Sequence, residues 1–213
     1  RLNMSLPTTK NIVTIDDAKL LVWEITQSID ELVSGLEGFT LFAVDFEKIN
    51  SDKRKLEFLG TRWLLKILLG KETNVQYTAD GKPYLNDESY HISLSHSGKW
   101  MAVMIHPTKQ VGIDIECPTD KIQKVYKRFL NETEQVELSD GKNIKQLQIA
   151  WSAKEALYKI IGKEAVDFAN QLRLLPFEVQ TKGRITALHL VTNTVYQLTY
   201  TQTAAYTLVY CIA

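Results

Sequence analysis

Apolar residues recur at intervals of three and four positions in five stretches of the chain, which is the spacing of one helix face. Ser51 precedes one of these stretches as a good N-cap, and Gly35, Gly70 and Gly162 follow three of them as stop signals. The pattern therefore predicts helices over 16–34, 51–70, 121–130, 132–138 and 143–161.

Other segments have the pattern of strands. Short apolar or alternating runs, separated by turn signals such as Asp80-Gly81, predict strands at 39–46, 90–95, 100–106 and 111–116. Residues 185–213 contain no Asp, Glu, Lys or Arg, and Thr, Val and Tyr alternate there with period two. This end of the chain predicts a meander of antiparallel strands.

The order of these elements indicates two related halves that join near Gln110. We expect an α+β fold of two similar α/β halves, 1–110 and 111–213, related by a pseudo-twofold axis. Each half would hold an antiparallel-type sheet packed on a long helix. The crevice between two such halves is the natural place for a ligand, so the active site is expected there.

Composition narrows the function classes. The 213 residues include 25 basic and 25 acidic side chains, so the formal net charge is zero. A chain without net positive charge does not attract a polyanion overall, and we expect no nucleic-acid partner. Two cysteines are too few for a disulfide scaffold or a four-thiolate zinc site. No stretch reaches the length of about 20 apolar residues that spans a bilayer, so a cytoplasmic protein without a membrane partner is expected.

The segment Val111-Gly112-Ile113-Asp114-Ile115-Glu116 is the first chemical candidate. Alternate residues of a strand face opposite sides, so Asp114 and Glu116 project from one face together. Two carboxylates side by side repel each other, and a hard divalent cation such as Mg²⁺ relieves that repulsion. The alternative is an ordinary strand with one solvated face.

The second candidate lies in the helix expected at 143–161. Glu155 and Lys159 are four residues apart and share a face, and Lys154 is the only other charged residue between Ile149 and Ile161. An exposed Glu–Lys pair is a common helix decoration. This helix is otherwise apolar, however, and charges on a mostly buried helix need a partner or a ligand.

Two further segments offer groups that suit a phosphate. Ser95 and His96 begin a polar turn with hydroxyl, imidazole and backbone N–H groups together, which is also the composition of a plain hairpin turn. Gly81-Lys82-Pro83 follows a helix with a basic face that includes Arg54 and Arg62, and such a face is also typical of a solvated surface. The chain has no Walker loop, GxGxxG or HExxH motif.

The order of these segments is more specific than any one of them. Gly81-Lys82-Pro83, Ser95-His96-Ser97-Gly98, the segment from Val111 to Glu116, and Trp151-Ser152-Ala153-Lys154-Glu155-Ala156 with Lys159 together resemble the 4′-phosphopantetheinyl transferases of the two-half, Sfp-like group. The resemblance covers residues 81–159 directly. It implies an enzyme of the holo-[acyl-carrier-protein] synthase type, which moves phosphopantetheine from coenzyme A to a serine of an apo acyl or peptidyl carrier protein and releases 3′,5′-ADP.

The resemblance also implies roles for individual residues. It makes Asp114, Glu116 and Glu155 the ligands of Mg²⁺, and it brings Lys154 and Lys159 to the pyrophosphate of the coenzyme. The 3′-phosphate and adenosine would meet the first-half residues Lys82, Pro83, Ser95 and His96. Arg54 and Arg62 are further candidates for the coenzyme phosphates, from their charge and position.

Phosphoryl transfer needs mainly alignment of the reactants and neutralisation of negative charge. The nucleophile would be a serine of the carrier protein, so this chain needs no catalytic triad of its own. The base that takes the serine proton is Glu155 or, if its pKa is depressed, Lys159. We expect a monomer.

The alternatives are a non-catalytic module that binds coenzyme A or a carrier protein, and a phosphotransferase that acts on small alcohols. The basic residues just after the proposed metal strand would face an acidic carrier helix: Lys121, Lys124, Lys127 and Arg128.

Overall fold

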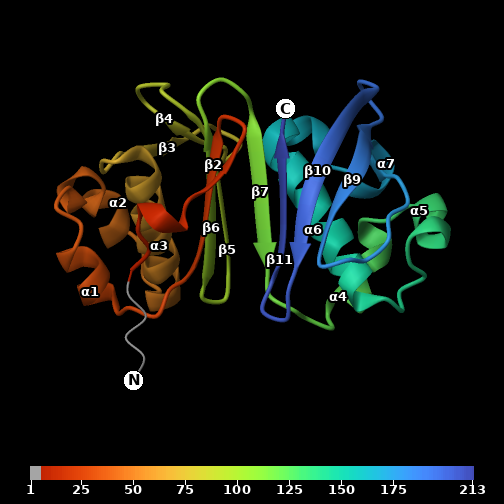
Figure 1. Cartoon of the computed structure of the whole chain (residues 1–213), viewed down its shortest axis with the longest axis horizontal. Coiled ribbons are helices and arrows are strands. Elements are labelled where there is room, and N and C mark those ends of the chain that lie inside the picture. The colour runs from red at the N-terminus through yellow and green to blue at the C-terminus, as the bar shows by residue number, and fades with distance from the viewer. Residues whose placement is uncertain (1–5) are drawn as a thin grey trace. The chain divides into compact units, whose positions relative to one another are not determined.

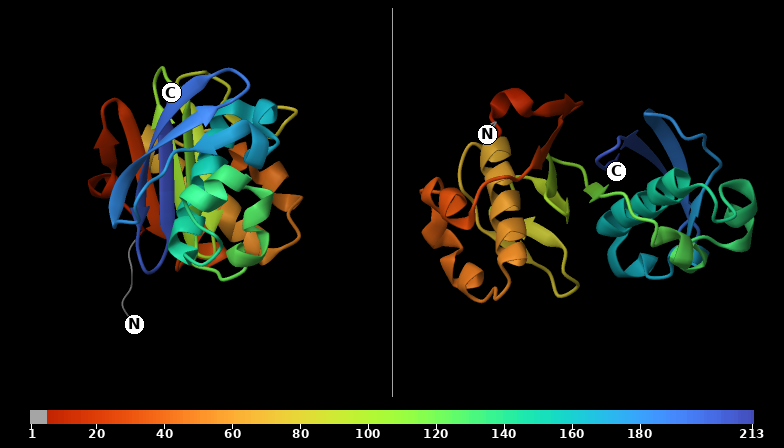
Figure 2. Two further views of the ribbon diagram at one scale, coloured as in Figure 1. Left: turned by 90° about the vertical axis from the view of Figure 1, so that its right-hand side faces the viewer. Right: turned by 90° about the horizontal axis from the view of Figure 1, so that it is seen from below.

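The computed structural model describes residues 6–213, which form two compact units that divide between Thr108 and Lys109 (Figure 1). Each unit contains an antiparallel sheet with one long helix against it (Figure 2). The expected α+β class is therefore confirmed. None of the helices within residues 6–213 has the length and apolar character needed to cross a membrane.

The first unit is built on a four-stranded sheet of order β1-β2-β6-β5. Its strands are β1 Val13–Ile15, β2 Ala18–Glu24, β5 His91–Ser97 and β6 Trp100–His106. A separate hairpin pairs β3 Val75–Tyr77 with β4 Pro83–Leu85. The helices are α1 Ile29–Ser34, α2 Ala43–Glu47 and α3 Asp52–Leu69, with 3₁₀ turns at Thr9–Asn11 and Phe39–Leu41.

The long helix α3 confirms the prediction for 51–70. Ser51 caps its first turn by accepting a hydrogen bond from the N–H of Arg54, and Gly70 ends it in the left-handed conformation at φ 75°. The helix packs on β2 and β6, and its buried Leu59 and Leu64 join the apolar core of this unit. The sequence pattern therefore placed both ends of this helix and its apolar face.

The helix predicted over 16–34 is wrong. A hairpin of β1 and β2 occupies this region, with Ile15 opposite Ala18 and Asp16 in the left-handed region at φ 51°. Asp tolerates that conformation, so Asp16-Asp17 makes a tight turn rather than a helix start. The helix begins only at Ile29, and Ser28 before it and Glu31 in its first turn form a capping box.

The strand predicted over 39–46 is also wrong, because this segment forms a 3₁₀ turn followed by α2. Phe39, Phe42 and Phe46 are spaced three and four residues apart, which puts their rings on one helical face. The ring of Phe39 lies 5.5 Å from that of Phe42 and 5.2 Å from that of Phe46, centre to centre. Aromatic packing on a helical period thus outweighs the strand propensity of the run.

The second unit contains a five-stranded antiparallel sheet of order β7-β11-β10-β9-β8. Its strands are β7 Val111–Glu116, β8 Leu172–Leu174, β9 Lys182–His189, β10 Thr194–Gln202 and β11 Thr207–Ile212. Its helices are α4 Ile122–Val125, α5 Glu132–Glu137, α6 Ile144–Ile161 and α7 Phe168–Gln171, with 3₁₀ turns at Tyr126–Arg128 and Gly162–Ala165. The predicted antiparallel meander at the end of the chain and the predicted strand at 111–116 are confirmed.

The helix predicted over 143–161 is confirmed as α6. Asn143 caps it by accepting from the N–H of Gln146, and Gly162 ends it with φ 75°. The helix packs against β7 and β11, and Leu147, Ala153 and Leu157 along it are fully buried. These contacts place the charged residues at the end of α6 beside β7.

Candidate active site

A glycine in β7 lets the helix α6 approach the strand closely. A Cβ atom at Gly112 would overlap the carbonyl oxygen of Ala156 and touch the side chain of Ile160. The face of β7 that carries Gly112 therefore points at α6, and alternation puts Asp114 and Glu116 on the same face. The two carboxylates lie under the helix rather than on a solvated side of the sheet.

Lys159 of α6 reaches across to β7. Its Nζ donates to the carbonyl of Ile113 at 2.6 Å and to Oδ1 of Asp114 at 3.1 Å. Asp114 is only 4% exposed, so water screens the Coulomb attraction between the two charges less than it would on the surface. The ammonium group of Lys159 thus neutralises part of the negative charge at the strand.

Glu155 lies one helical turn before Lys159 and shares the electrostatics of the strand. Burial is the main cause that raises the pKa of Glu155 to about 7, and the charges of Asp114 and Glu116 raise it further against the lowering effect of Lys159. The carboxyl of Glu155 is therefore within electrostatic reach of both strand carboxylates. A group with a pKa near neutrality can both accept and release a proton at physiological pH.

Glu116 has a partner that sequence reasoning missed. The indole Nε1 of Trp151, in the first half of α6, donates to Oε1 of Glu116 at 3.3 Å. The sequence marks Trp151 only as the first residue of the motif that contains Lys154 and Glu155. The signal that could have identified this contact is its spacing, since Trp151, Glu155 and Lys159 are four residues apart along α6.

The structure thus brings together four of the residues expected to carry chemistry: Asp114, Glu116, Glu155 and Lys159. Their three carboxylates form an all-oxygen donor set that suits a hard divalent cation. As placed in the structure, no three His, Cys, Asp or Glu side chains within residues 6–213 lie close enough together to hold a metal ion. The donor set fits Mg²⁺ in its chemistry, and the side chains would have to close around the ion.

The expectation that Lys154 meets a pyrophosphate is wrong. Lys154 is 0% exposed, and its Nζ donates to the carbonyls of Phe129 at 2.6 Å, Phe168 at 2.8 Å and Leu172 at 2.7 Å. It also forms an ion pair at 2.8 Å with Glu134, which is itself fully buried. The three protons of the ammonium group are shared among these acceptors, so Lys154 serves the interior of the unit.

In the first unit, His96 and Arg54 converge on a carboxylate that sequence reasoning did not select. Glu57 of α3 lies 3.4 Å from Nδ1 of His96, 3.6 Å from a guanidinium nitrogen of Arg54 and 3.9 Å from Nζ of Lys53. Glu57 is almost fully buried, whereas His96 on β5 and Arg54 are accessible. The sequence signal was the i, i+3 and i+4 spacing of these charges on the helix.

The remaining first-unit candidates lie in different surroundings. Arg62 is buried, with its guanidinium stacked 3.9 Å above the ring centre of Phe58 and donating to the hydroxyl of Tyr77 at 3.2 Å. Ser95 is buried and precedes His96 on β5, so the two side chains point to opposite faces. On the β3–β4 hairpin, burial lowers the pKa of Lys82, and Pro83 pairs with Tyr77.

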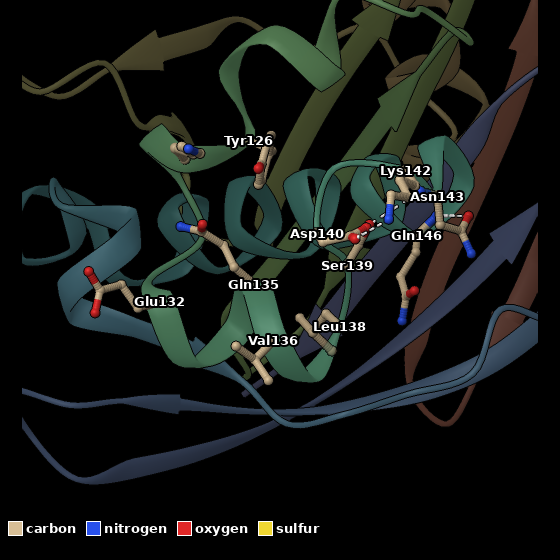
Figure 3. Close-up of a pocket in the computed structure, with 11 residues that line it drawn as sticks. Tyr126, Glu132, Gln135, Val136, Leu138, Ser139, Asp140, Lys142, Asn143 and Gln146 are labelled. Atoms are coloured by element: carbon tan, nitrogen blue, oxygen red, sulfur yellow. Dashed lines mark hydrogen bonds and ion pairs between the residues drawn. The ribbon is translucent and has the colours of Figure 1, made fainter.

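A cavity of about 700 Å³ lies in the second unit between the 3₁₀ turn at Tyr126–Arg128, α5 and the start of α6 (Figure 3). Its lining mixes apolar and charged groups. Val136 is 88% exposed there, and Lys142 forms an ion pair with Asp140 at 2.8 Å. Lys127 of the expected carrier-facing basic segment also lines the cavity.

Comparison with known proteins identifies relatives of the sequence. Residues 110–211 match the family model of the 4′-phosphopantetheinyl transferase superfamily. A putative 4′-phosphopantetheinyl transferase of Synechocystis sp. is 30% identical over 141 residues, which cover 59% of this chain and 57% of that protein. The 4′-phosphopantetheinyl transferase HetI of Nostoc sp. is 28% identical over 178 residues, 74% of each chain.

The 4′-phosphopantetheinyl transferase Sfp of Bacillus subtilis is 33% identical over 87 residues, which cover 39% of this chain and 38% of that protein. This chain spans little more than half the length of some relatives, 57% of the Synechocystis protein and 54% of a putative 4′-phosphopantetheinyl transferase of Haemophilus influenzae. The segment matched by the family model includes both β7 and α6 with their charged residues. The half of the chain that carries β7 and α6 is therefore similar to the 4′-phosphopantetheinyl transferase superfamily.

Proposed function

We propose that this protein transfers 4′-phosphopantetheine from coenzyme A to a serine hydroxyl of an apo acyl or peptidyl carrier protein, as a holo-[acyl-carrier-protein] synthase. The serine oxygen forms a bond to the phosphorus next to pantetheine, and the bond from that phosphorus to the bridging pyrophosphate oxygen breaks. That oxygen leaves with 3′,5′-ADP. The observation that carries the proposal is the set of Asp114, Glu116, Glu155 and Lys159 between β7 and α6.

The residues of this set divide the chemical work. Asp114, Glu116 and Glu155 would hold Mg²⁺, which when bound neutralises charge on the pyrophosphate. Lys159 orients the pyrophosphate and offsets the negative charge that grows on the leaving group. Glu155 is also the proposed base for the serine proton; burial raises its pKa to about 7 without a cation, and a bound Mg²⁺ would lower it again. If Lys159 is the base instead, it must first give up a proton.

The first unit would bind the far end of the coenzyme. His96 and Arg54, gathered at Glu57, offer an imidazole and a guanidinium group for the 3′-phosphate. Lys82, Pro83 and Ser95 belong to the same proposed region, and Arg62 would contribute positive charge from the interior. Because one chain carries both groups of residues, the protein is proposed to act as a monomer. A cytoplasmic location is proposed as well.

The carrier protein is proposed to dock on the second unit, near the cavity beside α5. Lys127 at its edge and Lys124 of α4 carry positive charge, and Val136 presents an apolar side chain to solvent. An acidic helix with an apolar residue on the same face would match this combination.

The decisive experiment is incubation of several apo carrier proteins with coenzyme A, Mg²⁺ and this protein, followed by intact mass measurement. A gain of one phosphopantetheine per carrier is expected. The matched controls are a carrier whose acceptor serine is replaced by alanine and the enzyme variant Glu155→Gln, and neither should give the gain. No gain on any carrier would contradict the proposal, and consumption of coenzyme A without a carrier would indicate transfer to a small alcohol.

A further inference from the structure

The indole of Trp151 connects the proposed metal-binding strand to a pair of phenylalanines. One edge of the indole donates to Glu116, as described above. Its ring meets Phe129 edge to face at 5.3 Å and Phe168 at 5.6 Å, centre to centre. Two aromatic walls from separate segments of the chain therefore hold the indole in one orientation.

The same two phenylalanines are bound through their backbones by Lys154. Its Nζ donates to the carbonyls of both residues, and the ion pair with Glu134 sets the position of the ammonium group. Glu134 is fixed in turn, since its carboxylate accepts the N–H groups of Asn131 at 3.0 Å and Leu174 at 2.8 Å. The walls of the indole slot are thus tied to one buried charged centre.

A buried ion pair is a costly way to hold a core together. Well-packed apolar residues of similar volume often give equal or greater stability, so the pair needs another explanation besides stability. Here the Lys154–Glu134 pair holds the carbonyl of Phe129, before α5, and the carbonyl of Phe168, in α7, beside α6. Both residues held at this point contact the ring of Trp151.

We propose that Trp151 is a positioning residue that fixes the carboxylate of Glu116 for binding a divalent cation, with the Lys154–Glu134 pair holding the slot in which the indole lies. This inference rests on the proposed function, because it takes Glu116 as a metal ligand. It assigns to Trp151 a role through Glu116 and no contact with substrate. Groups that orient metal ligands by hydrogen bonds typically change metal affinity when they are removed.

The alternative is that Trp151 is only a core aromatic, and the variant Trp151→Phe separates the two. It keeps an aromatic ring for packing against Phe129 and Phe168 and removes the indole N–H. The matched control is Trp63→Phe in the first unit, which removes an indole N–H that donates at 2.9 Å to the carbonyl of Leu32. Both variants lose a similar hydrogen bond, and only one of these bonds involves Glu116.

The measurement is the dissociation constant of Mn²⁺ in the presence of coenzyme A, followed by electron paramagnetic resonance of the free ion. We expect Trp151→Phe to raise this constant about tenfold and Trp63→Phe to leave it unchanged. In a Glu116→Gln background, Trp151→Phe should add no further loss, because the group it positions is gone. Thermal unfolding of each variant checks that it remains folded.

Unchanged Mn²⁺ affinity in folded Trp151→Phe would overturn the inference, and so would an equal loss with and without Glu116. A wild-type protein that binds Mn²⁺ but modifies no carrier would refute the proposed transfer while leaving this comparison valid. A wild-type protein that does not bind Mn²⁺ would refute the metal ligands and the positioning role together. If Trp151→Phe does not fold, Phe168→Leu removes one wall and keeps the N–H, and it should raise the Mn²⁺ dissociation constant by a smaller factor.

Discussion

Lys159 Nζ lies 3.1 Å from Oδ1 of Asp114, so a cation from the end of α6 already neutralises the most buried carboxylate of β7. The charge of Lys159 also opposes the rise in the pKa of Glu155. One ammonium group therefore acts on two carboxylates, and through Glu155 its removal should be visible in the pH dependence of the reaction.

The variant Lys159→Met should move the acidic limb of the rate profile to higher pH. In the wild type, transfer should fall as Glu155 gains its proton; the pKa of Glu155 is about 7 without a bound cation, and Mg²⁺ shifts this acidic limb to lower pH. Loss of the nearby positive charge raises that pKa further, by up to about one pH unit. The kcat/KM for carrier modification, measured from pH 5.5 to 9, tests this, and a limb that stays in place would mean that Glu155 is not the titrating group.

Glu155 should also make folding stability depend on pH. Its folded pKa of about 7 lies above the ordinary value of 4.5, so between these values the folded chain binds more protons than the unfolded one. Its contribution to stability is present below pH 4.5 and is lost as the pH rises to 7, by up to about 3 kcal/mol. Urea unfolding of the wild type and Glu155→Gln at pH 5 and 7.5 measures it. The difference between the two proteins should grow in favour of the variant at the higher pH.

Lys154→Met should destabilise the protein much more than Lys159→Met does. It leaves the carboxylate of Glu134 buried without its cation, which costs about 3–5 kcal/mol. In a protein of this size, that corresponds to a fall in Tm of roughly 10 °C. Calorimetric scans of the two variants provide the comparison. Equal and small shifts would show that the buried pair contributes little.

His96→Ala should raise the KM for coenzyme A and leave kcat nearly unchanged, because the proposed contact is remote from the reacting phosphorus. The same variant should lose less with dephospho-coenzyme A, which lacks the 3′-phosphate. A matched control is His91→Ala, on the same strand and away from Glu57. If KM for both coenzymes is unaffected by His96→Ala, His96 does not belong to the site.

Docking of the carrier on the basic segment predicts a strong salt effect. The KM for the carrier should rise steeply between low and physiological ionic strength, since screening weakens attraction between exposed charges. Charge reversal at Lys124 and Lys127 should produce the same rise at low salt, whereas reversal at exposed Lys182 of β9 should not. A carrier KM indifferent to both salt and charge reversal would place the docking face elsewhere.

The elements that sequence predicted well are those in which several local signals agree. Ser51, an apolar stripe and Gly70 all define α3, and the alternation in β7 follows directly from Ile113 and Ile115 against Asp114 and Glu116. The segment over 16–34 misled because its apolar residues match a helical period while β2 pairs with β6, a contact about 80 residues away. Such long-range pairing leaves no local signal in the segment itself.

The sequence predicted that Asp114 and Glu116 share a face of β7 and that Glu155 and Lys159 share a face of α6, and the structure brings these two faces together. It did not predict that Lys154 lies buried elsewhere. Five residues along a helix rotate a side chain by about 140°, so Lys154 and Lys159 had to point in different directions. The sequence could show that Lys154 does not lie on the face of α6 that carries Glu155 and Lys159. It could not show that three carbonyls and Glu134, from segments before and after α6, would meet at Lys154.

The burial of Lys154 has a consequence for chemical labelling. Burial lowers its pKa to about 8, so by basicity alone it would be among the more nucleophilic amines of the chain at neutral pH. No reagent reaches it, because the side chain is 0% exposed, while the Lys159 side chain is 25% exposed. An acylating reagent applied to the folded protein would therefore modify Lys159 and spare Lys154, and delayed modification of Lys154 would record opening of the second unit.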